Sequence, residues 1–577
     1  MTQGILPPEL KSVEQLLAGD ARYAVPIYQR SFAWGQDEIE ELWEDISSAA
    51  GRQDKDYFLG TIVLHKKDSG PHEIIDGQQR LICVSMVFSA IRNVFLSAHD
   101  RRENQIFLAY LGASDFSRDA QPQPKLVLNK INNETYIQHV INSTNVNEVE
   151  TALKSKGLHE SNKALLKAYR YFLDKITTEA SNRGTRADDF LVPLVDCLRN
   201  AIKVITIPVM SEEAANLFFE TLNARGKDLA VSDLVKNRLY FEAGENQVSR
   251  AQQLWEQMES DLVRRPIPEF LRHFWIAKKI DAKGFNVREK QLYRMVAQEV
   301  KGKKAATLKL LKELGTSARD YAKISDYSLW PDDAAYDASF ETALNELRLF
   351  RVTQCNPILL NAIQCFSKHK DVATTFKTVV NFSFRYFIIG NQSPGNLERV
   401  SNGIAAGIRT KKLGTPSQVA DEFRGINPDT TFRADFALAV MPKARAKIAR
   451  HTLAKLTNFM SKQSGRAGSE KITNPDAKQV TLEHVLPQNP GNAWTSKFPN
   501  DVKPSDYIYR LGNLTLLTAK VNRECADASF AEKERIALNN SSLDINRYFK
   551  AVKRWTNKEI EKRQAELANI AAEIWKL

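Results

Sequence analysis

The sequence predicts an α+β protein that is rich in helix and divided into three domains. Its 577 residues exceed the length of one domain, which is typically about 150 residues. Strand-like and helical segments alternate up to residue 240, whereas helical patterns dominate residues 241–440. We predict an N-terminal α+β domain at 1–240, a helical connecting domain at 241–440 and a C-terminal domain at 441–577.

The elements of the first domain follow from the spacing of its apolar residues. Tyr57–His65 (YFLGTIVLH) and residues 73–76 (EIID) favour strands, and the Lys-Asp-Ser-Gly sequence between them is typical of a hairpin turn. Residues 203–209 (KVITIPV) predict another strand. Within residues 39–46 and 81–95, apolar side chains recur every three or four positions, which indicates helices with one apolar face.

The composition excludes several classes of protein. A hydrophobic content of 43% and a charged content of 26% are typical of a globular chain, not a disordered or fibrous one. The sequence has no apolar run of about 18 residues and no basic, then apolar, leader at its start, so we expect neither a membrane span nor a secretory signal. Its five cysteines form no C-x-x-C pair. We therefore expect a reduced, cytoplasmic protein that does not contact a membrane.

The positive charge is concentrated near the C-terminus. The net charge is +12, and residues 441–577 hold 24 Lys and Arg against 14 Asp and Glu. That part therefore carries +10 and the rest of the chain +2. A local basic surplus favours a polyanion partner, of which nucleic acid is the most common, although a solvated basic surface has the same composition.

The most informative C-terminal residues are TLEHVLPQN (481–489), LGNLTLL (511–517) and Asn522. Phosphodiester hydrolysis needs an activated water and stabilisation of negative charge around the phosphorus atom. A neutral histidine takes a proton from water near pH 7. Mg²⁺ prefers oxygen ligands, and the carboxylate of Glu483 and the amide oxygen of Asn522 suit it.

These residues resemble the site of HNH, or ββα-metal, nucleases. Their form, E-H-x-x-P-Q with L-G-N-L, is most similar to the C-terminal domain of the GmrSD type IV restriction endonucleases. The resemblance implies that His484 is the general base, that Glu483 and Asn522 bind Mg²⁺ (or Mn²⁺), and that Asn513 orients the loop after His484. Taken separately, E-H is typical of a surface strand end and L-G-N-L of a turn. Many HNH sites have Asp or His where this chain has Glu483.

The same resemblance places a helix after the site. It carries Trp555, Ile560 and Arg563 in the sequence RWTNKEIEKRQAEL. We expect Trp555 and Ile560 to pack on the nuclease fold. Arg563 is a candidate contact to DNA phosphate.

Two N-terminal segments, VPIYQRSFAW (25–34) and IIDGQQRL (74–81), fit a phosphate site. Gly77 allows a tight turn, and free N–H groups at the helix start around Gln78, Gln79 and Arg80 favour an anion. The Arg80 guanidinium can bind phosphate oxygens in a fork. The remaining candidates are Asp76, as a helix cap or metal ligand, and Gln29 and Arg30, which would close the site from another loop.

These segments resemble the N-terminal domain of the same GmrSD group, which is related to the ParB/sulfiredoxin fold. A third matching segment is LFFETLNARGKDLAVSDLVKN (217–237), in which Asn223, Arg225 and Lys227 are candidate contacts to nucleotide or DNA. A C-capping Gly226 with solvated basic neighbours is the simpler interpretation of that segment.

The resemblance implies one chain that combines a ParB-like nucleotide-binding domain with an HNH nuclease. We expect an endonuclease of phage defence that depends on a nucleoside triphosphate (NTP) and Mg²⁺ and cuts invading DNA with modified bases. The alternatives are a phosphorothioate-sensing nickase with NTPase activity, a nucleotide-switched DNA-binding protein with an inert nuclease domain, and a scaffold for RNA or protein. A homodimer is also left open.

Overall fold

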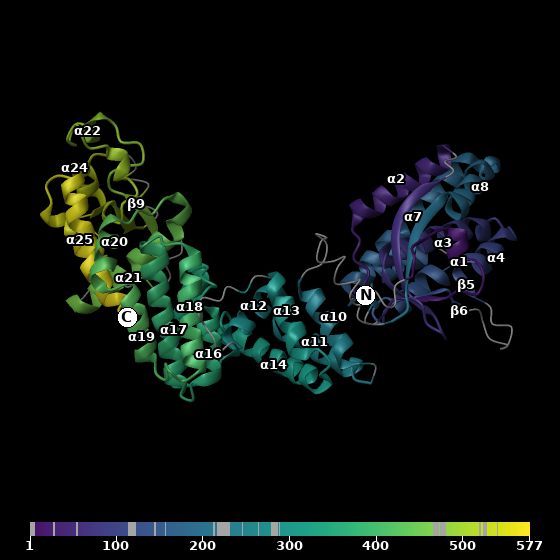
Figure 1. Cartoon of the computed structure of the whole chain (residues 1–577). Helices are drawn as coiled ribbons and strands as arrows, with labels where there is room; N and C mark the ends of the chain where they lie inside the picture. The colour runs from purple at the N-terminus through teal and green to yellow at the C-terminus, as the bar shows by residue number, and fades with distance from the viewer. Residues whose placement is uncertain are drawn as a thin grey trace. The chain divides into compact units, whose positions relative to one another are not determined.

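The computed structural model describes residues 6–577 apart from short gaps, and it divides into two compact units (Figure 1). The first unit comprises residues 1–248 and 296–304, and the second comprises residues 249–295 and 305–577. The residues that are not described are 1–5, 27–28, 53–55, 114–122, 144–145, 156, 212–213, 216–230, 245, 264, 279–286, 288, 466–471, 473–479, 519–520, 523–524, 526–527 and 539–540.

The first unit is built on a six-stranded mixed sheet with the strand order β1-β8-β3-β4-β2-β7. Strands β3 and β4 form the antiparallel hairpin expected from the sequence, and β8 pairs with β3 in parallel. The amino-terminal strand β1 pairs antiparallel with the other edge of β8. The strands are β1 (Glu9–Ser12), β2 (Tyr23–Ala24), β3 (Tyr57–His65), β4 (His72–Asp76), β7 (Leu126–Val127) and β8 (Ile202–Val209), with a separate pair β5 (Gly112–Ala113) and β6 (Gln123–Pro124).

Helices account for most of the rest of this unit, so the α+β, helix-rich class expected from the sequence is confirmed. They are α1 (Val13–Leu17), α2 (Gln36–Arg52), α3 (Gln78–Ser97), α4 (Arg102–Ile106), α5 (Asn133–Tyr136), α6 (Val146–Leu153), α7 (Glu160–Arg183), α8 (Asp188–Asp196) and α10 (Val231–Ala243).

Helix α3 is the central core helix of the first unit. Among the described residues it alone is long and apolar enough to cross a membrane, but most of it is buried inside the unit. Its polar residues have partners there: the Ser85 hydroxyl lies 2.8 Å from that of Tyr136, and Asn93 donates to the Tyr169 hydroxyl at 3.0 Å. These buried hydrogen bonds fix α3 against α5 and α7.

The second unit begins with a helical region, as the sequence predicted for the middle of the chain. Its helices are α11 (Val248–Asp261), α12 (Ile267–Lys278), α13 (Glu289–Val300), α14 (Lys304–Lys323), α15 (Ala338–Phe350), α16 (Asn356–Cys365), α17 (His369–Ser383), α18 (Pro394–Arg409), α19 (Pro416–Ile426), α20 (Asp429–Leu438) and α21 (Ala446–Ser464). The boundaries between the two units fall within three of these helices, α11, α13 and α14, so part of each of them is assigned to the first unit.

The C-terminal part of the second unit is a small hairpin surrounded by helices. Strands β9 (Thr481–His484) and β10 (Leu514–Leu517) pair antiparallel, so that His484 lies opposite Leu514. The long helix α25 (Asn557–Ile574) packs against α20 and against the turn that precedes β10. The short helices α22 (Asn492–Thr495) and α24 (Phe530–Lys533) complete this part.

Candidate active site

The hairpin of β9 and β10 places the two most informative residues of the sequence at the end of a strand. Glu483 and His484 are the last two residues of β9, and the chain turns away immediately after them. The Glu483 side chain is buried, with only 7% of it exposed, and His484 is half-buried.

The His484 side chain has one nitrogen without a partner. Its Nδ1 lies 3.4 Å from the Gln488 amide nitrogen, and its ring meets Tyr509 edge-on. Its Nε2 is buried and has no hydrogen-bond partner among the described residues. Burial, and then the charge of Lys533, lower the pKa of His484 to about 4. The imidazole is therefore neutral at pH 7 and available to accept a proton.

Asn513 fixes the loop that follows His484. Its Oδ1 accepts hydrogen bonds from the Leu486 backbone N–H at 2.7 Å and from the Trp555 indole at 2.9 Å. Its Nδ2 donates to the Leu486 and Ile508 carbonyls at 3.0 and 2.9 Å. These four bonds use both donors and both acceptor positions of the amide. Asn513 therefore has no capacity left for a metal, which is compatible with an orienting role.

The position of Gly512, which precedes Asn513, has no room for a side chain. A Cβ at this position would overlap the Ile560 carbonyl oxygen of α25. The Gly512 N–H also donates a hydrogen bond to Gln564 Oε1 at 3.0 Å. Within L-G-N, Gly512 thus allows α25 to pack closely, and Asn513 holds the loop after His484 by hydrogen bonds.

Asn522 lies against the strand that carries Glu483. Its Nδ2 donates to the Thr481 hydroxyl at 2.9 Å and to the Leu482 carbonyl at 3.4 Å. Strand alternation puts Thr481 and Glu483 on the same face. The Asn522 Oδ1 accepts no hydrogen bond from the described residues. Carboxylate and amide oxygens suit a Mg²⁺ that keeps several waters, but in this structure the Lys533 ammonium group occupies Glu483 Oε1.

Lys533 is a charged residue of this site that the sequence analysis missed. It is 1% exposed, and its Nζ lies 2.5 Å from Glu483 Oε1 and 2.8 Å from the His484 carbonyl oxygen. Its sequence context, AEKER, is that of a solvated helix. Only the folded chain shows that α24 carries this ammonium group to the end of β9.

The helix predicted after the site is α25, and Arg563 on it is not placed to contact DNA. Trp555 and Ile560 are buried, as expected. Arg563 is 1% exposed, and its Nη1 donates to the Gly512 and Leu514 carbonyls at 2.7 and 2.8 Å. Burial lowers the pKa of Arg563 to about 9. The candidate DNA contact is therefore corrected to a structural role, in which Arg563 ties α25 to β10.

The N-terminal candidates gather where β4 ends and α3 begins. Gly77 lies between them with φ +88°, and a Cβ there would approach the Thr61 carbonyl oxygen to 2.9 Å. No side chain caps α3, so the hydrogen-bonding capacity of its first N–H groups is not used by a cap. Arg80 passes close to Gly60, and its Nη1 donates to the Thr61 carbonyl at 3.4 Å.

Residues 29–33 form the second wall of this site. Gln29 Nε2 donates to the Ile75 carbonyl at 2.9 Å, and Gln78 Nε2 donates to the Arg30 carbonyl at 3.1 Å. Gln79 Oε1 accepts from the Ala33 N–H at 3.0 Å. The other side-chain atoms of these two glutamines, Gln78 Oε1 and Gln79 Nε2, are buried without a partner among the described residues. The structure thus brings all seven predicted residues of the D-G-Q-Q-R site together.

Asp76 is the one acidic side chain among those seven. Burial raises its pKa, while the charges of Arg80 and Arg30 act in the opposite direction. The candidates Asn223, Arg225 and Lys227 lie outside the described residues.

Comparison with known proteins defines the class first: both family models that match the chain are domains of a restriction endonuclease. The N-terminal domain of the GmrSD restriction endonuclease matches residues 13–240, and the C-terminal domain of GmrSD restriction endonucleases matches residues 426–570. The chain therefore belongs to the GmrSD restriction endonuclease family, of type IV, and its partner is DNA. The comparison with curated proteins gave no match.

Proposed function

We propose that this protein is an HNH-type endonuclease of phage defence that requires Mg²⁺ (or Mn²⁺), is regulated by an NTP and cuts foreign DNA with modified bases. The observation that carries the nuclease assignment is the buried, unpartnered Nε2 of a neutral His484 at the end of β9. A buried polar atom without a partner is costly and therefore points to a missing ligand or to a chemical role.

The chain's own residues carry out the proton transfer in this proposal. His484 Nε2 takes a proton from water, the water oxygen bonds to phosphorus, and the bond from phosphorus to the 3′ oxygen breaks. The departing oxygen takes a proton from solvent. Asn513 holds the loop after His484 so that the imidazole keeps its orientation. Glu483 and Asn522 would hold the metal ion, which supplies positive charge to the phosphate oxygens.

The D-G-Q-Q-R segment is the proposed nucleotide site. Its support is the uncapped start of α3, the neighbouring Arg30 and Arg80 guanidinium groups, and the two unpartnered atoms of Gln78 and Gln79. Backbone N–H groups at a helix start and a guanidinium together suit phosphate oxygens. The nucleotide would license or restrain cleavage by the C-terminal site.

A cleavage assay tests this function. Supercoiled plasmid and phage DNA, with and without modified bases, are incubated with the full-length protein, an NTP, and either Mg²⁺ or EDTA. We expect cleavage of modified DNA that EDTA abolishes and that the NTP changes. Cleavage limited to phosphorothioate DNA would favour the nickase, and DNA binding without cleavage would favour an inert nuclease domain.

A further inference from the structure

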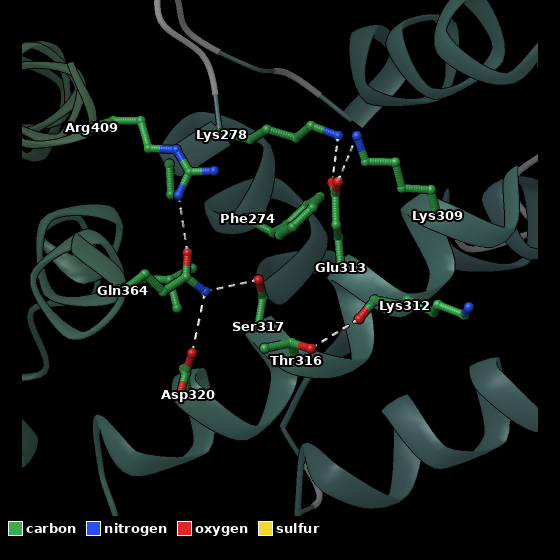
Figure 2. A pocket seen from close by; sticks show the side chains of 12 residues that line it. Phe274, Lys278, Lys309, Lys312, Glu313, Thr316, Ser317, Asp320, Gln364 and Arg409 are labelled. Carbon is green, nitrogen blue, oxygen red and sulfur yellow. Dashed lines mark hydrogen bonds and ion pairs between the residues drawn. The ribbon is translucent and has the colours of Figure 1, made fainter. Parts of the chain in front are cut away.

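A pocket of about 520 Å³ lies in the helical region of the second unit, outside the residues that either family model matches. Its walls come from α12, α14, α16 and α18 (Figure 2). The volume is within the range of pockets that bind small molecules, about 300–1,000 Å³.

The pocket lining has a surplus of positive charge. Four lining side chains are cationic (Lys278, Lys309, Lys312 and Arg409), and two are carboxylates (Glu313 and Asp320). Glu313 is shared by two lysines, with Nζ–O distances of 2.8 Å to Lys278 and 4.0 Å to Lys309. Asp320 pairs at 3.2 Å with Lys323, which is not part of the lining, and also accepts a hydrogen bond at 3.4 Å from the lining residue Gln364.

Arg409 is held at the rim by neutral groups. Its Nη1 donates to Gln364 Oε1 at 3.4 Å, and Gln364 Nε2 donates in turn to the Ser317 hydroxyl at 2.9 Å. Among the described residues, no carboxylate pairs with Arg409. In Figure 2, the Phe274 ring lies between the Arg409–Gln364 pair and the lysines at Glu313.

The floor of the pocket is apolar. Phe274, Ala277 and Leu360 are buried core residues that also line it. We propose that this pocket binds the phosphate group of a nucleotide. Its source is either a free nucleotide or a nucleotide of the DNA. The cations at the rim take the phosphate oxygens. This site is separate from the D-G-Q-Q-R segment and does not depend on it.

Lysine footprinting on the full-length protein tests the proposal. The protein is treated with an amine-acylating reagent alone, with ATP, or with a short DNA duplex, and the labelling rate of each lysine is measured by mass spectrometry. At a ligand concentration ten times Kd, labelling of Lys309 should slow about tenfold, because only the free fraction reacts. Lys368 and Lys370, which are exposed residues of the same unit, should keep their rates.

Two variants test whether the protection of Lys309 comes from a ligand in this pocket. Arg409→Gln should lower the affinity for the protecting ligand about tenfold, since a charge-assisted hydrogen bond is lost. Arg399→Gln removes an exposed cation from the same helix and should change nothing. The Arg80→Ala protein should keep the footprint, which separates this pocket from the proposed N-terminal nucleotide site.

The footprints distinguish a free nucleotide from a nucleotide of the DNA as the ligand. Protection by ATP assigns a free nucleotide, and protection by the duplex alone assigns the phosphate of DNA. Equal labelling of Lys309 under all three conditions, or a footprint that Arg409→Gln leaves unchanged, would overturn the proposal.

Discussion

Burial affects the charges of the two residues at the end of β9 in different ways. It removes the charge of His484, whose imidazole has a cation rather than an anion beside it. Glu483 instead has the buried ammonium group of Lys533 at 2.5 Å, which compensates a carboxylate where an isolated charge would be costly. The end of β9 therefore holds a neutral imidazole and, on the adjacent residue, a carboxylate paired with an ammonium group.

The metal roles lead to a prediction for three variants. Glu483→Ala and Asn522→Ala should each raise the Mg²⁺ concentration needed for half-maximal cleavage, because each removes an oxygen ligand. Asn513→Ala should lower the rate with less change in metal dependence, since its amide is occupied by the loop and Trp555. Titration of cleavage rate against Mg²⁺ measures both effects. Wild-type metal dependence in all three variants would show that the ligand assignment is wrong.

Lys533 leads to a prediction about stability. Lys533→Met leaves the Glu483 carboxylate buried beside an uncharged group and should reduce the free energy of unfolding by about 3–5 kcal/mol. The double variant Lys533→Met with Glu483→Gln should recover much of that loss, because no charge is then left without its partner. Urea unfolding of the single and double variants gives the comparison. Equal stability of the single variant and the wild type would mean that the pair does not compensate Glu483.

At the scale of elements, local patterns could be predicted and long-range contacts could not. The β3–β4 hairpin, β8 and the start of α3 after Gly77 follow from strand propensity, a turn sequence and a glycine that tolerates positive φ. The pairing of β1 with β8 joins segments almost 200 residues apart, and the two-residue strand β2 is too short for a periodic signal. Lys533 and Arg563 have the sequence context of surface cations, so only tertiary packing shows that they are buried.

The start of α3 leads to a prediction about the nucleotide. Arg80→Ala should abolish NTP hydrolysis and alter the NTP dependence of cleavage, because the variant loses a charged, forked contact while the helix N–H groups remain. Basal HNH chemistry should persist. NTP turnover and DNA cleavage are measured on the same sample. Unchanged turnover would exclude D-G-Q-Q-R as the phosphate site.

Helices α15 and α21 are joined by a buried ion cluster whose contribution depends on pH. Glu346 Oε1 lies 2.5 Å from His451 Nε2 and 2.7 Å from Lys455 Nζ. Burial alone would raise the pKa of Glu346, but the bonds to His451 and Lys455 outweigh it and leave the pKa below the ordinary value of 4.5. A lowered folded-state pKa stabilises the protein above about pH 4.5, and that stabilisation is lost as the pH falls through the lowered value.

The prediction compares the wild type with Glu346→Gln. The variant should have a lower Tm at pH 7, and the difference between the two proteins should shrink as the pH falls below about 4.5. Thermal unfolding across this pH range checks it, with Glu341→Gln, an exposed position of α15, as control. A difference that does not vary with pH would exclude an ionic contribution from Glu346.

In the whole molecule, each compact unit contains the full range of one matched domain. The GmrSD N-terminal match lies in the first unit and the C-terminal match in the second. The basic surplus of residues 441–577 lies in the same part of the sequence as the β9–β10 hairpin, whereas the residues proposed for the nucleotide lie about 400 positions earlier in the chain. One polypeptide thus combines a candidate regulatory site with a candidate cutting site.

The most direct test of the central claim is DNA cleavage by His484→Ala in the full-length protein with Mg²⁺ and NTP. Loss of a general base typically lowers a rate by about 10²–10⁴-fold. We predict a loss of that size with nearly unchanged folding and DNA affinity, while His369→Ala, an exposed histidine of the helical region, cleaves like the wild type. Cleavage by His484→Ala within a few-fold of the wild-type rate would show that His484 is not the general base.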